Sequence, residues 1–301
     1  MAGANIPEAE VDVDAGLAAR LLADQHADLA GLPITQVANG WDNVIFRLGD
    51  DLALRIPRRE LAAQLVVSEQ EWLPKLASTL PLRIPAPVRN GRPTGYYPWH
   101  WSVVPWVPGE AVGTRPFSSP ASAAKSLGEF LRALHQPTDG AAPENPWRGE
   151  PLAKRDKRTR ENIAAVASEL PASVERMAGI WNDAIAAPAW SGPPILLHGD
   201  LHPLNMIATN GELSAVIDFG DITDGDPATD LMVGFYLFDL ADHGIFKAAA
   251  ESAIRPIDDA MWLRAKGWAL SHMTLVLAHS ADSPELLAVA RKGLQRVVVA
   301  S

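Results

Sequence analysis

The stretch "PPILLHGDLHPLNMIATNGELSAVIDFGD" (193–221) decides the fold, because it combines a β-hairpin with a concentrated set of polar side chains. Asn210-Gly211 between two apolar segments is a strong signal for a two-residue hairpin turn. With that turn, the ladder runs back until Asn205 lies opposite Val216. The register therefore predicts two antiparallel strands whose open end carries the polar residues.

That open end gathers oxygen-bearing side chains. Asp218 lies two positions beyond Val216, so it shares a sheet face with Asn205 as a diagonal neighbour, about 7–8 Å away. Asp200 lies in the loop that leads into the first strand at the same end. Such oxygen ligands suit a hard cation such as Mg²⁺ that also holds substrate phosphates. Asp and Asn often serve only as turn residues, but their joint arrangement favours a functional site.

A metal site built on histidine is the weaker alternative. His198 and His202 are four residues apart, a spacing that places two side chains on one face only if the segment is helical. Pro203 follows His202 directly and is unfavourable inside a helix. The sequence therefore favours a site built on Asp200 over a site built on the two histidines.

The composition narrows the class of protein. The 301 residues are 48% hydrophobic and 21% charged, as in ordinary globular proteins, and the net charge of -10 disfavours nucleic acid as a partner. The absence of cysteine excludes disulfides and cysteine nucleophiles. The N-terminal residues lack the apolar core of a secretory signal, and no apolar run reaches the ~18 residues of a membrane helix. We therefore expect a soluble, cytoplasmic protein without a membrane partner, and a monomer is favoured.

Hydrophobic periodicity predicts a mixed first part and a helical remainder. We expect strands at about 34–38, 43–48, 52–56 and 95–109, and helices at 14–27 and 60–78. Further helices are expected at about 120–135, 155–168, 172–187, 228–241, 244–254, 258–280 and 284–299. The prolines of "PWVPG" (105–109) indicate a hinge at about 103–109, between an N-terminal lobe (1–105) and a C-terminal lobe (106–301).

"HGDLHPLN" (198–205) followed by "VIDFGD" (216–221) resembles the aminoglycoside phosphotransferase family, whose fold is similar to that of protein kinases. The stretch "DGDPATDL" (224–231) also resembles this family, and "LALRIPRR" (52–59) is similar to a strand of the related macrolide phosphotransferases. The resemblance covers about residue 35 to the C-terminus. It implies an α+β, two-lobed fold, with a small β-sheet and one main helix in the first lobe and a mostly helical second lobe that carries the catalytic hairpin.

The resemblance also implies roles for the motif residues. Asp200 would orient the substrate hydroxyl or accept its proton. Asn205 and Asp218 would be catalytic residues that hold Mg²⁺ against the phosphates of ATP or GTP. His198 would support the loop structurally, and Asp230 would brace it.

For the nucleotide, the resemblance points to the N-terminal strands and their helix. Arg55 stands where the family usually has lysine, and its bidentate geometry is not equivalent to that of lysine. Glu69 would pair with this cation, with Glu71 as the fallback. "NGWDN" (39–43), which includes Asn43, would form the turn over the phosphates.

The remaining candidate residues would surround the base and the acceptor. Apolar or aromatic walls for the base are expected from Ala53, Val104, Trp106, Ile207 and Ile217. Contacts to the acceptor or the transferred phosphate are expected from His202, Asp221, Asp239, Trp268 and His272. Between positions 200 and 259 the only bases are Lys247 and Arg255, so this acidic region would attract a cationic acceptor.

The leading hypothesis is a small-molecule kinase that phosphorylates a hydroxyl of an aminoglycoside or a related amino sugar, and a role in antibiotic resistance would follow. A macrolide, choline, homoserine or sugar acceptor is the alternative that the motifs leave open. A nucleotide-binding pseudokinase without turnover is a third hypothesis, and the complete set Asp200, Asn205 and Asp218 argues against it.

Overall fold

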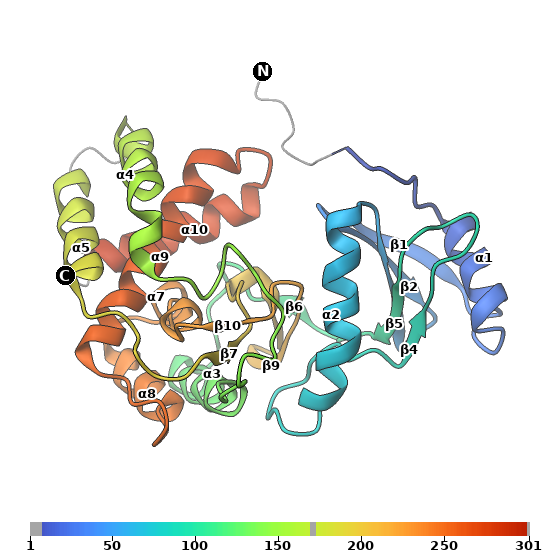
Figure 1. Ribbon diagram of the computed structural model, residues 1–301, viewed down its shortest axis with the longest axis horizontal. Coiled ribbons are helices and arrows are strands. Elements are labelled where there is room, and N and C mark those ends of the chain that lie inside the picture. Colours follow the sequence, from blue (N-terminus) through green and yellow to red (C-terminus); the bar gives the residue numbers. More distant parts are fainter. Residues whose placement is uncertain (1–7, 169–172, 300–301) are drawn as a thin grey trace. The chain divides into compact units, whose positions relative to one another are not determined.

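The first third of the chain combines strands with two helices, and helices dominate the rest. The computed structural model describes residues 8–168 and 173–299 (Figure 1). The composition is α+β, as predicted. Within this described part, no helix combines the length and the apolar character that crossing a membrane requires.

The described residues form two compact units. The N-terminal unit extends to Pro108 and also contains Val216–Gly220. The C-terminal unit contains Gly109–Ala215 and the described chain from Asp221 onward. Asp218 thus folds with the N-terminal unit, although it follows the hairpin of the C-terminal unit in the sequence.

An antiparallel sheet with the strand order β1-β2-β3-β5-β4 forms the centre of the N-terminal unit. Its strands are β1 (Ile34–Asn39), β2 (Asn43–Leu48), β3 (Leu52–Pro57), β4 (Arg89–Gly91) and β5 (Trp101–Pro105). The strands predicted at 34–38, 43–48 and 52–56 are confirmed. Gly49, with a φ of 58°, lies in the tight turn between β2 and β3, and glycine adopts this left-handed conformation without strain.

Helices α1 (Ala15–Gln25) and α2 (Glu60–Leu76) lie on opposite sides of this sheet (Figure 1). Leu21 and Leu22 of α1 pack into a core with Phe46 and Trp101 of the sheet. The inner face of α2 is apolar except for Glu69, which is buried with it. A buried carboxylate on an apolar face needs a partner of opposite charge, and the sheet supplies one.

The strand predicted over 95–109 is wrong in extent, because β5 covers only Trp101–Pro105. Pro98 interrupts the segment before it, since proline cannot donate to a strand ladder. After β5, the Trp106 N–H bonds the carbonyl of Asp51. The aromatic run therefore contains one short buried strand between two loops.

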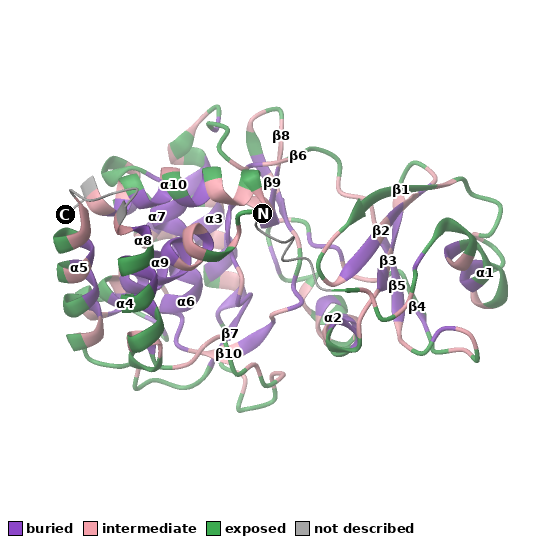
Figure 2. Ribbon diagram, turned by 90° about the horizontal axis from the view of Figure 1, so that it is seen from above, coloured by how far each residue is buried: buried purple, intermediate pink, exposed green. Residues whose placement is uncertain are grey.

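Helices make up most of the C-terminal unit. They are α3 (Pro120–Leu134), α4 (Asp156–Ala165), α5 (Val174–Ala186), α6 (Ala228–Leu231), α7 (Val233–Leu237), α8 (Leu240–Ala250), α9 (Asp259–His279) and α10 (Pro284–Val299). Short 3₁₀ helices cover Leu152–Arg155, Val166–Ser168 and Pro203–Asn205. Helix α9 packs against α4, α5, α6 and α10, and most of its length is buried (Figure 2). A side chain on α9 is therefore held on a rigid element.

The single helix predicted over 228–241 is wrong. The chain forms α6 and α7 and then leaves the helical conformation at Phe238 and Asp239, both extended. Phe238 is buried and stacks with Phe117, which fixes the break. Helix α8 consequently begins at Leu240, several residues before the predicted start.

The predicted hairpin is present as β8 (Met206–Thr209) and β9 (Glu212–Val216), joined by Asn210 and Gly211 with φ of 53° and 79°. Positive φ at both turn residues is typical of a type I′ turn. Strand β6 (Glu110–Ala111) pairs with β8, and β7 (Ile195–Leu197) pairs with β10 (Thr223–Gly225).

The ladder is shorter than predicted at its open end. Asn205 lies in the 3₁₀ turn before β8, where Pro203 sets the backbone, and Asp218 follows β9 with a left-handed φ of 63°. The prediction that these two residues are diagonal neighbours on a ladder is therefore wrong, because neither lies in a strand.

Candidate active site

The loop that carries Asp200 follows strand β7. Gly199, with a φ of 87°, allows the chain to turn there, and an added Cβ would lie 2.2 Å from the carbonyl oxygen of Asp221. A side chain at this position would clash with that backbone.

Asp230 on α6 fixes the loop by hydrogen bonds to its backbone. Its carboxylate accepts the backbone N–H groups of His198 and Gly199, at 2.8 and 2.9 Å, and it also bonds Nε2 of His135 at 3.0 Å. Burial raises the pKa of Asp230, but the histidines and these hydrogen bonds outweigh it, so the net pKa is lowered. The residue predicted as a brace thus lies directly against the loop.

His198 is fully buried in this loop. Its Nδ1 accepts the backbone N–H of Asp200 at 3.3 Å, so the imidazole fixes the backbone rather than facing solvent. Asn205 holds the loop from the other side, because its side-chain amide donates to the Asp200 carbonyl at 2.9 Å. That bond uses the amide nitrogen and leaves the Asn205 oxygen as the atom able to bind a metal ion.

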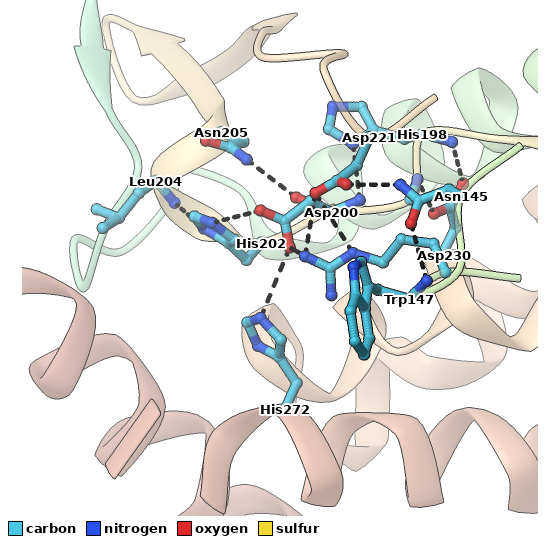
Figure 3. Close-up of polar contacts among 12 residues, drawn as sticks. Asn145, Trp147, His198, Asp200, His202, Leu204, Asn205, Asp221, Asp230 and His272 are labelled. Atoms are coloured by element: carbon cyan, nitrogen blue, oxygen red, sulfur yellow. Dashed lines mark hydrogen bonds and ion pairs between the residues drawn. The ribbon is translucent and has the colours of Figure 1, made fainter. Parts of the chain in front are cut away.

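The Asp200 carboxylate is surrounded by nitrogen donors (Figure 3). Arg148 Nη2 lies 2.7 Å from Oδ1, and His272 Nε2 lies 3.6 Å from the same oxygen. His202 Nε2 lies 3.5 Å from Oδ2. Burial raises the pKa of Asp200, but Arg148 and the two imidazoles outweigh it and hold the pKa well below its usual value. Asp200 is therefore ionised, and its direction is fixed by its neighbours.

Arg148 connects this carboxylate to a second one. Its guanidinium also contacts Asp221 Oδ2 at 3.1 Å, and Asn145 donates to the other oxygen of Asp221 at 2.7 Å. Asp221 is thus part of the structure that holds Arg148 in place. Trp147, which lies between Asn145 and Arg148 in the sequence, is exposed over 64% of its surface.

A second polar cluster lies in the N-terminal unit. Arg55 Nε is 3.2 Å from Glu69 Oε2, and Arg55 Nη2 is 2.7 Å from Asp218 Oδ1. Burial raises the pKa of Glu69, Arg55 lowers it and Asp218 raises it, with a net pKa of about 7. Glu71, the fallback partner, instead pairs with Lys75 on the exposed face of α2. The sheet, the helix and the segment after β9 thus bring Arg55, Glu69 and Asp218 together.

The other residues predicted to bind the nucleotide have different surroundings. Asn43 is buried, and its Oδ1 has no hydrogen-bond partner in the described part of the chain. Trp106 lies half-buried under the guanidinium of Arg47, 4.2 Å from it. The others are apolar positions, of which Ala53, Val104 and Ile207 are buried and Ile217 is half-buried.

Only part of the predicted acceptor set lies at Asp200. His202, Asp221 and His272 belong to the Asp200 cluster. Asp239 instead pairs with Arg296 at 2.7 Å and lines a pocket of about 160 Å³. Trp268 is 2% exposed and has the guanidinium of Arg155 over its ring. These last two residues have structural partners of their own.

Sequence reasoning missed Arg148, Asn145 and His135. The first two lie in "QPTDGAAPENPWRGEP" (136–151), which has no periodicity and forms an irregular loop. An arginine in such a segment gives no local signal of its partner, because the contact with Asp200 joins residues 52 positions apart. His135 ends α3 and meets Asp230 across 95 positions.

The buried His135 makes stability depend on pH. Burial, followed by repulsion from Arg255, lowers the pKa of His135 to about 4, although Asp230 raises it. Its Nδ1 has no partner within the described chain, so protonation would create a buried, unsatisfied donor. The unfolded state, with an ordinary histidine pKa, binds this proton first as pH falls. Stability from His135 is therefore complete above about pH 6.5 and is lost towards pH 4, by about 3 kcal/mol.

The measurement is urea unfolding between pH 7 and pH 4 of the wild type and of His135→Gln. Glutamine can place a nitrogen donor towards Asp230 but does not titrate. The variant should show a flatter pH dependence over this range. Equal slopes for the two proteins would contradict the assignment.

The chain was also compared with known proteins. The profile of the phosphotransferase enzyme family matches residues 33–268. Comparison with curated protein sequences gives no match. Among solved structures, the fold is similar to a GDP complex of a mutant aminoglycoside 2'-phosphotransferase of type IIIa, with a TM-score of 0.65 and 18% identity over 94% of this chain and 96% of that chain.

Two further structures have the same fold. One is the apoenzyme of a macrolide 2'-phosphotransferase from Brachybacterium faecium, with a TM-score of 0.60 and 21% identity over 92% of this chain and 96% of that chain. The other is APH(2")-IIa in a ternary complex with streptomycin and ATP, with a TM-score of 0.57 and 19% identity over 95% and 97%. The predicted kinase-like fold is thereby confirmed. With the family profile spanning most of its length, the chain belongs to the phosphotransferase enzyme family, and its activity is phosphoryl transfer to a hydroxyl group.

Proposed function

We propose that this enzyme transfers the γ-phosphate of ATP or GTP to a hydroxyl of a small molecule, with an aminoglycoside or a related amino sugar as the acceptor class. The observation that carries the proposal is the Asp200 carboxylate, which is ionised, buried on one side and fixed by Arg148 and two imidazoles. A hydroxyl needs such an acceptor to align it for attack on a phosphoryl group.

In this mechanism Asp200 orients the acceptor hydroxyl and takes its proton late. Phosphoryl transfer passes through a loose transition state in which positioning matters more than a strong base. A carboxylate whose pKa is held low suits that role, because it remains an acceptor at neutral pH. Asp230 and His198 contribute by holding the backbone on which Asp200 is mounted.

Asn205 and Asp218 are proposed as the protein ligands of Mg²⁺. Their chemistry fits this ion, because Asn205 keeps its amide oxygen available and the Asp218 side chain is 50% exposed. When bound, Mg²⁺ supplies charge neutralisation on the nucleotide phosphates. Arg55, oriented by Glu69, is proposed to contact the same phosphates from the N-terminal unit. Asn43 is proposed to lie in the turn over the phosphates, and the walls of the base site are proposed from Ala53, Val104, Trp106, Ile207 and Ile217.

For the acceptor, the loop 143–150 offers more than the acidic residues do. Arg148 offsets the charge of Asp221, and Arg296 offsets that of Asp239, so part of the predicted attraction for cations is already cancelled. Trp147 adds a different feature, an exposed indole directly beside Arg148 in the chain (Figure 3). An aromatic face of this kind packs against the apolar face of a sugar ring. This supports a glycoside acceptor, and His202 and His272 face the same carboxylate.

Replacing Trp147 tests this part of the proposal. Trp147→Ala should raise the KM for the acceptor by about tenfold, because a stacking contact of about 1 kcal/mol or more is lost. The KM for the nucleotide should stay unchanged, and Trp147→Phe should recover most of the loss. Initial rates against acceptor concentration give both constants. An unchanged acceptor KM in Trp147→Ala would remove Trp147 from the acceptor site.

The function itself is tested by an acceptor screen. Purified protein with Mg-ATP or Mg-GTP is incubated with aminoglycosides, macrolides, choline, homoserine and simple sugars, and phosphorylated products are detected by mass spectrometry. We expect a product with an aminoglycoside or another amino sugar. Product only with a macrolide or a metabolite alcohol would overturn the acceptor class, and no product together with no nucleotide hydrolysis would overturn the proposed reaction.

A further inference from the structure

His272 reaches the Asp200 cluster from a rigid element. It lies within α9, is buried, and places Nε2 3.6 Å from Asp200 Oδ1. Its ring stacks beside that of His202, with centroids 5.9 Å apart (Figure 3). The 3.6 Å separation is long for a hydrogen bond, but such contacts commonly shorten when substrate binds.

Tyr236 decides which nitrogen of His272 carries the proton. The Tyr236 hydroxyl lies 2.6 Å from His272 Nδ1, and the described chain gives that hydroxyl no other hydrogen-bond partner. Burial, with the charge of Asp200 next, raises the pKa of Tyr236 well above its usual value, so the hydroxyl keeps its proton. Burial lowers the pKa of His272, so the ring is neutral at neutral pH.

Two neutral arrangements are then conceivable. If Nδ1 carried the proton, the tyrosine hydrogen would have no acceptor, and the lone pair of Nε2 would face the negative Asp200 carboxylate. If the Tyr236 hydroxyl donates to Nδ1, Nε2 carries the proton and points it at Asp200. Only the second arrangement satisfies both donors, and it places a positive bond dipole against the carboxylate.

The tautomer of His202 is fixed in the same way, by a different partner. Its Nδ1 accepts the backbone N–H of Leu204 at 3.2 Å, which leaves Nε2 as the protonated nitrogen beside Asp200 Oδ2. The two histidines therefore approach different carboxylate oxygens, each with a fixed tautomer.

We propose that His272 is a positioning residue for Asp200, held as the Nε2–H tautomer by the Tyr236 hydroxyl. Arg148 and His272 both hold Oδ1 of Asp200, whereas Oδ2 has His202 Nε2 as its neighbour at 3.5 Å and is the oxygen that receives the acceptor hydroxyl. The inference rests on the proposed role of Asp200 and extends it to one atom and to a tyrosine–histidine pair outside the sequence motifs.

The first test reads the tautomer directly. In protein labelled with ¹⁵N-histidine, two-dimensional NMR should show His272 in the Nε2–H form, and Tyr236→Phe should shift it towards a mixture of forms. Tyr97→Phe is the matched control, because Tyr97 also donates from a buried hydroxyl, to the carbonyl of Pro57 at 2.8 Å, in the N-terminal unit. A wild-type His272 in the Nδ1–H form would overturn the proposal.

The second test measures the hydrolysis of Mg-ATP and Mg-GTP to inorganic phosphate, because this reaction needs no identified acceptor. Tyr236→Phe should lower kcat about 5-fold and His272→Leu about 10- to 100-fold, with KM for the nucleotide unchanged. His272→Gln should recover part of the rate, because its amide nitrogen can take the place of Nε2.

The outcomes separate this inference from the proposed function. A wild type that hydrolyses no nucleotide and phosphorylates no acceptor would count against the proposed function itself. An active wild type, with Tyr236→Phe and Tyr97→Phe alike in melting temperature and in kcat, would overturn the positioning role alone. If His272→Leu fails to fold, the comparison of Tyr236→Phe with Tyr97→Phe still tests the positioning role.

Discussion

Asp200→Asn is expected to lower kcat for phosphoryl transfer at least ~100-fold, the usual contribution of a positioned acid–base group. Asparagine keeps the shape of the side chain but loses the charge that faces Arg148 and the two imidazoles. It also presents an N–H group where a hydroxyl hydrogen must be accepted. Nucleotide affinity should change by no more than about twofold, because Asp200 acts on the acceptor hydroxyl and not on the nucleotide.

The measurement is steady-state kinetics with the acceptor found in the screen, together with calorimetric titration of Mg-nucleotide. Asp259→Asn, an exposed aspartate in the first turn of α9, is the matched control for loss of one negative charge. A kcat for Asp200→Asn near that of the control would exclude Asp200 from the chemistry. A fall in nucleotide affinity as large as the fall in kcat would assign Asp200 to nucleotide binding.

Asp218→Asn is expected to have an effect of similar size, through the metal ion. The backbone at 218 is left-handed, with a φ of 63°, and asparagine is one of the few residues that adopts this conformation easily. The variant should therefore fold normally, while a neutral amide replaces a charged Mg²⁺ ligand. We expect kcat to fall ~100-fold or more and the Mg²⁺ concentration for half-maximal rate to rise.

Rates measured across a Mg²⁺ titration distinguish the metal role from a structural one. Asp218 also pairs with Arg55, so the substitution removes one partner of that guanidinium and leaves Glu69 in place. If Asp218 acts only by orienting Arg55, the rate will fall without any change in Mg²⁺ dependence. That result would contradict the assignment of Asp218 as a metal ligand.

The sequence predicted the parts of the molecule that local chemistry determines. The Asn210-Gly211 turn, the three N-terminal strands and the loop around Asp200 follow from turn preferences and from a short motif. The predicted hairpin register is wrong at its open end, because Pro203 and the left-handed Asp218 end the ladder early. Alternation along a strand cannot show where the strand stops.

The contacts of Arg148 and Tyr236, which join distant segments outside the motifs, could not be predicted. Arg148 lies in an irregular loop and contacts Asp200. Tyr236 lies in a short helix and contacts His272 of α9. The separation of α6, α7 and α8 has the same origin, since burial of Phe238 overrides the helical periodicity of the segment. Such features follow from tertiary packing, and no local pattern encodes them.

The most direct test of the account is transfer of radiolabelled γ-phosphate from Mg-ATP or Mg-GTP to an amino-sugar acceptor, measured side by side for the wild type, Asp200→Asn and Asp259→Asn. The account predicts labelled product from the wild type and from Asp259→Asn at similar rates, and almost none from Asp200→Asn. Labelled product from Asp200→Asn at the wild-type rate would contradict it.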